Sequence, residues 1–143
     1  MKILHCKEFG PVENLVWENI DSPEPGDDEV LISVKAAALN FPDYLIVQGL
    51  YQFKPEFPFA PGNEGAGVIK KIGKNVTKFK EGDRVYFMSA YGAFAEEICM
   101  HELGTLQLKK THLSKWLHHI KWHMAPAIMP LCKEVNSRKM MNY

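Results

Sequence analysis

The stretch PGNEGAGVIKKIG, residues 61–73, holds three closely spaced glycines, Gly62, Gly65 and Gly67. A Gly-x-x-Gly-x-Gly spacing occurs in dinucleotide-binding loops, where it must follow a strand and open a helix. Here the glycines lead directly into an apolar, β-branched run, and we expect residues 66–73 to form a strand. We therefore interpret the glycines as structural, because they let the backbone turn sharply before a strand.

Further short strands are expected on both sides of this stretch. Candidate strands cover residues 2–8, 15–20, 29–39 and 92–99, and residues 79–87 form a tight turn that enters another strand. In that turn we expect Gly82 and Asp83 to expose Arg84 while Val85 enters the core. Many short strands with turn signals between them predict a mainly β fold, either a small barrel or a partly open sandwich.

Non-strand segments are predicted by their own residue types. Residues 22–28 are dense in turn formers and do not fit inside a sheet. Residues 42–49 begin with proline and end with glycine, which is typical of a short helix. Residues 51–61 form a proline-rich loop that carries Phe53, Phe57 and Phe59.

The composition is that of a globular chain, with 46% hydrophobic and 24% charged residues among 143. No apolar run is long enough to cross a bilayer, and the first residues turn polar too early for a signal peptide, so a cytoplasmic protein is expected. Cys6, Cys99 and Cys132 are too scattered for a disulfide framework or a C-x-x-C metal site. We expect reduced cysteines, with Cys6 and Cys99 acting as small buried hydrophobic residues.

The net charge of zero hides an asymmetry along the chain. Residues 1–108 hold ten Lys or Arg and sixteen acids, a net charge of −6, whereas residues 109–143 hold seven Lys or Arg and one acid, a net charge of +6. Such a shift usually marks a boundary, and we place it at residue 108. Because residues 1–108 are acidic, nothing in them supports nucleic-acid binding.

Five short motifs occur in a fixed order, and each is weak alone. They are NFPDY at residues 40–44, PGNEGAG at 61–67, VIKKIG at 68–73, KEGDRV at 80–85 and YGAFAE at 91–96. The ordered set resembles the GroES-like domain of medium-chain dehydrogenases and reductases, and is most similar to their quinone oxidoreductase-like members. The resemblance covers residues 1–108 and implies a GroES-like, partly open barrel with short helices, followed by a poorly defined helical or disordered tail.

The resemblance also implies which chemistry to expect. Zinc members of the family hold their metal with a Cys and a His, where this chain has Asn40 nearby and Asn63. Neutral amides are poor zinc ligands, so no metal is expected. Zinc-free relatives transfer hydride from NADPH to a quinone or another activated double bond, and the cofactor supplies the hard chemistry.

By the same resemblance, Asn40, Asp43 and Tyr51 would border the substrate cleft as candidate catalytic residues. Asn40 would hydrogen-bond a carbonyl or the nicotinamide ribose, and Tyr51 would donate to a developing oxyanion. The structural alternative is that Asp43 supports the first turn of the helix and Tyr51 packs on the phenylalanine loop. Glu64, a supporting acid in zinc members, would be a structural acceptor.

Residues 109–143 do not match the family, which continues into a nucleotide-binding domain with its own glycine loop; no glycine occurs after Gly104. The genetic code suggests a reason. When the tail is read from the third base of each codon, several shifted residues are fixed, including Ala from Trp122–His123, Gly from Met124–Ala125 and Ala from Met129–Pro130. The remaining codons permit a reading close to the family's continuation. We therefore hypothesise an out-of-frame tail, whether from a frameshift, a pseudogene or a sequence error.

A genuine basic tail is the alternative. Trp116, His119, Ile120 and His123 lie at helical spacings, which suits contact with a membrane surface or an acidic partner. The histidine pair four residues apart is also found in metal sites, although incidental histidines are the favoured interpretation.

Three functions remain open at this stage. The first is an NADPH-dependent reductase, for which this chain has no strand, glycine loop and helix unit to bind the cofactor tightly, so the cofactor-binding residues stay unknown. The second, which we favour for the chain as written, is an inactive GroES-like remnant with exposed apolar surface around the cleft and a tendency to self-associate. The third is a non-catalytic module that binds through its basic tail.

Overall fold

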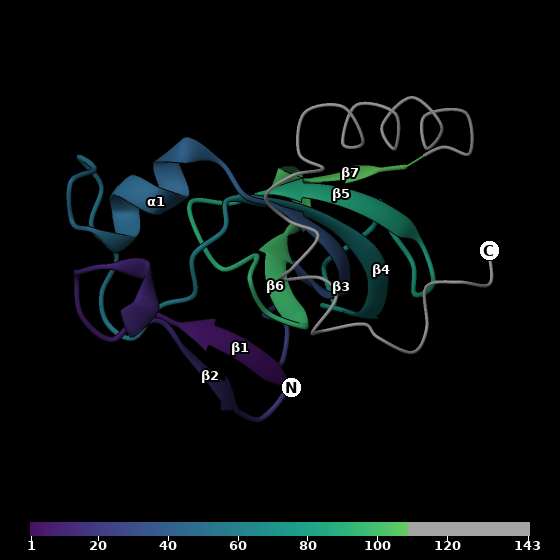
Figure 1. The fold of residues 1–143 in the computed structure, drawn as a ribbon. Coiled ribbons are helices and arrows are strands. Elements are labelled where there is room, and N and C mark those ends of the chain that lie inside the picture. Colours follow the sequence, from purple (N-terminus) through teal and green to yellow (C-terminus); the bar gives the residue numbers. More distant parts are fainter. Residues whose placement is uncertain (109–143) are drawn as a thin grey trace, which may run out of the picture. The chain divides into compact units, whose positions relative to one another are not determined.

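The structure is a computed structural model, and it describes residues 1–108 of the chain. Seven strands, two short 3-10 helices and one α-helix occur in this part (Figure 1). In chain order they are β1 (Lys2–His5), η1 (Val12–Asn14), β2 (Val16–Asn19), β3 (Glu29–Ala38), α1 (Phe41–Val47), β4 (Glu64–Ile72), β5 (Arg84–Met88), β6 (Glu97–His101), η2 (Glu102–Gly104) and β7 (Thr105–Gln107).

Five of the strands form one sheet in the order β6-β3-β4-β5-β7, with every neighbouring pair antiparallel. The sheet is strongly curved where β3, β4 and β5 run together, and it forms a half-barrel (Figure 1). Irregular pairing of β3 with β4 occurs after Leu31 and after Val34, and such bulges bend a strand and increase its twist. The predicted mainly β, partly open barrel is confirmed.

The main hydrophobic core lies inside this curved sheet. Its buried members are Val30, Ile32, Ile69, Val76, Val85, Phe87, Ala93 and Met100. In β3 the neighbours Val30, Leu31 and Ile32 are all 0% exposed, so both faces of this central strand are covered. In β5 the exposed Arg84 precedes the buried Val85, as the turn at Gly82 predicts, and Gly82 has a positive φ of 85°.

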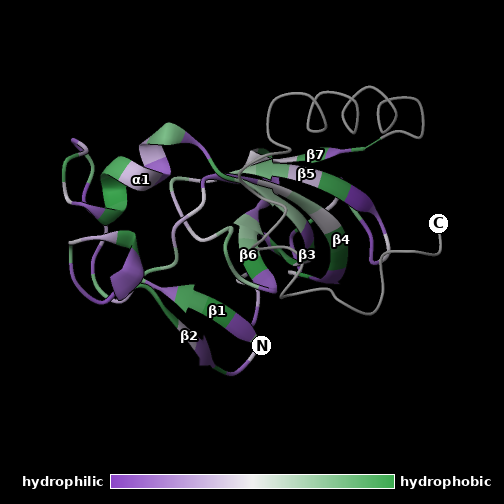
Figure 2. Ribbon diagram, in the orientation of Figure 1, coloured by the Kyte–Doolittle hydropathy of each residue, from purple (hydrophilic) through white to green (hydrophobic). Residues whose placement is uncertain are grey.

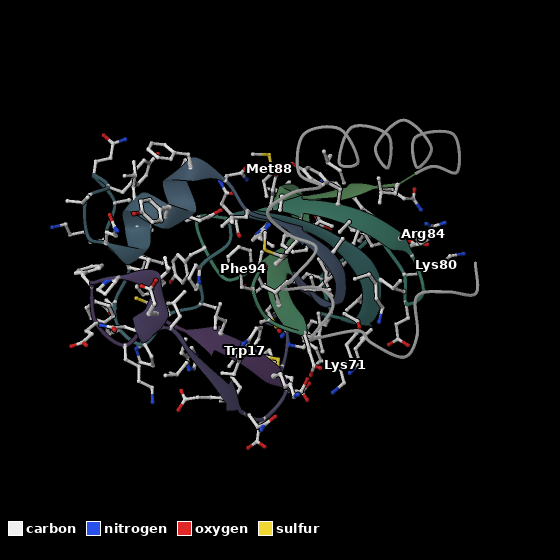
Figure 3. The ribbon with its side chains drawn as sticks, viewed as in Figure 1. Trp17, Lys71, Lys80, Arg84, Met88 and Phe94 are labelled. Atoms are coloured by element: carbon white, nitrogen blue, oxygen red, sulfur yellow. The ribbon has the colours of Figure 1, made fainter. Side chains whose placement is uncertain are left out.

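Figure 2 shows that hydrophilic residues gather at the ends of β4 and β5 that lie away from α1. Figure 3 places Lys71, Lys80 and Arg84 at that end, whereas Met88 lies toward α1. The sheet therefore has a charged end and an end that meets the helix.

A smaller unit packs beside the sheet. Strands β1 and β2 form an antiparallel pair, and single bridges join Ile3 to Ala95 and Cys6 to Phe59. A second core cluster of Cys6, Ile46, Val47 and Phe59 connects this unit to α1, with Phe9, Leu15 and Tyr51 packed against it. Both Cys6 and Cys99 carry free thiols; Cys6 is buried as expected, whereas Cys99 is only partly covered.

Several strand boundaries predicted from the sequence were wrong. The strand predicted over residues 92–99 is present only from Glu97, because Ala93 and Phe94 instead donate backbone hydrogen bonds to the loop carbonyls of Gly62 and Pro61. The first strand ends at His5 rather than at residue 8, and β7 was not predicted. Three-residue elements such as β7 carry too little periodicity to be recognised without their partner strand. The tail and its predicted helix lie outside the described residues.

Candidate functional site

A cleft of about 240 Å³ lies where α1, the loop after it and the ends of β4 and β5 meet. Its wall is made by Pro42, Ile46, Tyr51, Phe53, Asn63, Ser89 and Ala90. Pro42 and Ile46 come from α1, Asn63 immediately precedes β4, and Ser89 follows β5. The lining is mostly apolar with a few polar groups, which is the usual character of a small-molecule site.

Aromatic contacts hold the loop side of the cleft. Phe53 stacks on Tyr91 with ring centroids 6.0 Å apart, and Tyr91 in turn meets Phe59 edge-on at 6.0 Å. Tyr51 packs against the second core cluster, which contains Phe59. These contacts fix the loop although it contains no regular secondary structure.

Hydrogen bonds link the polar residues behind the cleft. The side-chain amide of Asn40 donates to Asn63 Oδ1 at 2.7 Å and to Glu64 Oε1 at 3.0 Å. Tyr86 donates its hydroxyl to the other oxygen of Glu64, Oε2, at 2.9 Å. Burial and this hydrogen bond to Glu64 raise the pKa of Tyr86 to about 12, so the phenol stays protonated as a donor.

Asp43 lies in the first turn of α1 and is 1% exposed. Its Oδ2 accepts the backbone N–H of Asn40 at 2.7 Å, which is half of a capping box at the start of the helix. Burial raises the pKa of Asp43, although the N–H groups of Asn40 and Gly62 oppose the change and the charge of Glu64 adds to it. These contacts are those of the structural alternative, in which Asp43 supports the helix.

The structure thus separates the three predicted site residues. Tyr51 lines the cleft, Asp43 is buried beneath the start of α1, and Asn40 is absent from the cleft wall but contacts Asn63, which belongs to it. Their catalytic roles stay predictions. Sequence reasoning did not find Ser89, and it considered Asn63 only as a residue that cannot bind zinc.

The glycines before and within β4 serve the packing of the sheet. A Cβ on Gly67 would lie 2.2 Å from the Ser33 carbonyl oxygen, and one on Gly65 would lie 2.6 Å from Cζ of Phe87. No described helix follows this run, because Gly65 and Gly67 lie within β4 itself. These contacts support the structural interpretation of the Gly-x-x-Gly-x-Gly spacing, in which the glycines allow close packing of the sheet.

The two positions compared with zinc ligands lie together, since Asn40 and Asn63 are hydrogen-bonded to each other. Within residues 1–108, no three His, Cys, Asp or Glu side chains converge as a metal site would require. None of the helices in the same part of the chain combines the length and apolar character needed to span a membrane.

An antiparallel half-barrel with a mostly apolar cleft at one end defines a small β-barrel domain. Residues 26–110 match the family described as alcohol dehydrogenase GroES-like domain. The chain therefore belongs to this family, and the predicted resemblance to quinone oxidoreductase-like medium-chain dehydrogenases and reductases is confirmed.

Individual relatives agree with this assignment. The chain is 39% identical over 104 residues to an alcohol dehydrogenase of Moraxella sp. (strain TAE123), covering 73% of this chain and 30% of that protein. It is 41% identical over 98 residues to the quinone oxidoreductase of Homo sapiens, covering 67% and 30% of the two chains.

Among solved structures, the quinone oxidoreductase of Escherichia coli complexed with NADPH matches with a TM-score of 0.74 and 29% identity. That match covers 78% of this chain and 34% of the E. coli chain. The chain therefore spans about a third of the length of these relatives.

Proposed function

We propose that residues 1–108 form the substrate side of an NADPH-dependent reductase that delivers hydride to a quinone or another activated double bond. The observation that carries the proposal is the cleft, in which apolar side chains surround Tyr51, Asn63 and Ser89. The names of the relatives support it, since they include quinone oxidoreductases and one that was solved with NADPH. A cytoplasmic location remains the prediction.

The cleft suits a small, flat acceptor. Its volume of about 240 Å³ is smaller than that of typical drug-sized pockets and matches a compound with a single ring. Phe53 and Ile46 offer apolar contact to the faces of such a ring. The hydroxyl of Tyr51 is a donor for an oxygen that becomes negative as hydride reaches the ring.

The described residues do not fit the cofactor itself. The glycine run leads into a closely packed strand, and α1 has only seven residues, so no strand, glycine loop and helix unit is available among residues 1–108 for the phosphates of NADPH. The cofactor would have to be held by other residues, and the part of the chain described here would bind and orient the acceptor. We therefore expect no catalytic turnover from these residues alone.

The test uses the full 143-residue chain and duroquinone, a one-ring quinone whose substituted ring resists addition of thiols. In two-dimensional NMR we expect its addition to shift signals of Tyr51, Phe53 and Ala90, without NADPH oxidation. Tyr51→Phe should weaken binding about fivefold, because one hydrogen bond is lost. Tyr44→Phe is the control, since Tyr44 lies on α1 and outside the cleft wall, whereas Tyr51 lies in the loop after α1 and lines the cleft. Signals that shift elsewhere, or a Tyr51→Phe variant that binds normally, would contradict the proposal.

A further inference from the structure

In the hydrogen bonds behind the cleft, the donor and the acceptor of each bond can be assigned, and the assignment begins with Glu64. Both oxygens of the Glu64 carboxyl group accept a hydrogen bond, one from Tyr86 and one from Asn40. Tyr86 donates to Oε2, and Asn40 must therefore turn its NH₂ group, not its carbonyl oxygen, toward Oε1. The backbone N–H of Asn40 is held by Asp43, which fixes the residue from the other side.

The orientation of the Asn40 amide in turn fixes the orientation of the Asn63 side-chain amide. One hydrogen of the Asn40 NH₂ group goes to Glu64 and the other to Asn63 Oδ1 at 2.7 Å, so the Asn63 side chain has to present its oxygen to Asn40. The Asn63 NH₂ group is thereby left without an acceptor among residues 1–108. The backbone of Asn63 is anchored as well, because its carbonyl accepts the N–H of Ser89 at 2.8 Å.

Asn63 and Ser89 both line the cleft. The hydroxyl oxygen of Ser89 is buried and has no hydrogen-bond partner within the described part of the chain. An amide donor and an unsatisfied hydroxyl therefore belong to the same small, otherwise apolar wall. Because the Ser89 hydroxyl is shielded from water, it costs free energy until it is paired. Together with the Asn63 NH₂ donor, this favours a ligand that carries an oxygen acceptor.

We infer that Asn63 is the residue that recognises the carbonyl oxygen of the acceptor, and that Asn40 and Glu64 are positioning residues that fix its amide as a donor. This inference rests on the proposed function and adds a specificity residue to it. The ligand class is a ring with a carbonyl acceptor, and a ring of the same shape without oxygen should bind less well.

The experiment compares duroquinone with durene, the hydrocarbon that has the same four methyl groups and no oxygen. For the unmodified full-length chain we expect duroquinone to bind about fiftyfold more tightly, from about fivefold for the Tyr51 hydroxyl and about tenfold for the Asn63 amide. In ¹H–¹⁵N spectra the side-chain NH₂ signals of Asn63 should move with duroquinone and stay in place with durene. This signature does not depend on any variant.

Two variants test the residues separately. Asn63→Asp keeps an oxygen for Asn40 and replaces the donor by an acceptor, so the preference should fall about tenfold, to the share contributed by the Tyr51 hydroxyl, while durene binding is unchanged. Asn40→Ala frees the Asn63 amide to rotate, and we expect the preference to fall about threefold. Asn75→Asp is the matched control for charge, because Asn75 is exposed and its side chain bonds to Asp28 within residues 1–108.

The outcomes distinguish the two proposals. If duroquinone and durene bind the cleft equally well, or if Asn63→Asp keeps the full preference, the role of Asn63 is wrong while the cleft as a ring-binding site stands. If neither compound binds, the proposed function fails and the inference fails with it.

Discussion

At the scale of single residues, burial and hydrogen bonding have opposite effects on the pKa of Asp43. Asp43 is 1% exposed, and its Oδ2 accepts the N–H of Asn40. Oδ1 makes no hydrogen bond among the described residues, although the N–H of Gly62 still favours the charged form. Burial dominates and raises the pKa above the ordinary value of 3.8. The folded chain therefore holds this proton more tightly than the unfolded chain does.

The raised pKa predicts how stability depends on pH. As the pH rises past 3.8, the unfolded chain releases the proton first, so the free energy of unfolding falls until the folded carboxyl group has ionised as well. Asp43→Asn removes this titration and keeps an oxygen for the N–H of Asn40. We expect the variant to gain stability relative to the unmodified chain as the pH rises above the ordinary value of 3.8, measured by urea unfolding.

Asp83→Asn serves as the control for this experiment. Asp83 also accepts a backbone N–H, that of Lys80 at 3.1 Å, but it lies in a surface turn. Its variant removes the same charge and keeps an acceptor for a backbone N–H, so it measures the effect of the substitution type apart from burial. A parallel pH dependence for Asp43→Asn would show that the Asp43 carboxyl group is not perturbed in the folded chain.

At the scale of elements, β4 is constrained by its neighbours on both sides. It pairs with β3 and with β5, and Gly67 lies opposite Val34 on one side and Val85 on the other. A Cβ on Gly67 would be 2.2 Å from the Ser33 carbonyl oxygen, which belongs to the backbone and cannot turn away. The glycine is therefore needed for close approach of the strands.

Gly67→Ala should destabilise the fold by about 2 kcal/mol or more, because β3 and β4 would have to separate. Urea unfolding with a tryptophan fluorescence signal measures this. Gly10→Ala is the control, since the nearest atom to a Cβ there is the movable Asn14 side-chain nitrogen at 3.1 Å. Equal midpoints for the two variants would contradict the packing argument.

Helix α1 was predicted to within two residues, and the reason is local. Pro42 near its start and Gly49 after its end are signals that depend on adjacent backbone only. The hydrogen bond from Asn40 N–H to Asp43 also spans just three residues. The cleft wall, by contrast, needs Ser89 and Ala90, which are far from α1 in the sequence.

At the scale of the whole molecule, apolar side chains are exposed on α1 and the loop after it. Phe41 is 72% exposed and Leu50 is 69% exposed, and Tyr44 and Phe53 lie at 44% and 41%. Exposed apolar groups that gather in this way favour contact with another surface. This distribution supports the prediction of self-association near the cleft.

We expect the full chain to self-associate as its concentration rises, measured by sedimentation equilibrium. The double variant Phe41→Gln and Leu50→Gln should weaken association about tenfold or more, because two apolar contacts are lost. Leu103→Gln is the matched control, since Leu103 is 73% exposed on η2. A monomer at all concentrations, or a control that acts like the double variant, would contradict the prediction.

The tail yields a prediction of another kind. Its codons, read out of frame, permit the continuation that the family has after its GroES-like domain. Sequencing of the genomic locus and the transcript through codons 100–143 tests this. We expect the shifted frame to stay open into a strand, glycine loop and helix unit. Stop codons in that frame would show that residues 109–143 are a genuine product, and the binding-module alternative would then be tested instead.

The sequence by itself determined the family, the mainly β class and the structural role of the glycines, since these depend on local patterns and on motifs in a fixed order. By resemblance it also predicted that Asn40, Asp43 and Tyr51 border one cleft. Only the tertiary structure decided that Tyr51 lines the cleft, that Asp43 is buried under α1, and that Asn40 contacts Asn63. The reason is physical: burial and hydrogen-bond direction arise from contacts between residues such as Asn40, Glu64 and Tyr86, which the chain brings together only when the sheet has formed.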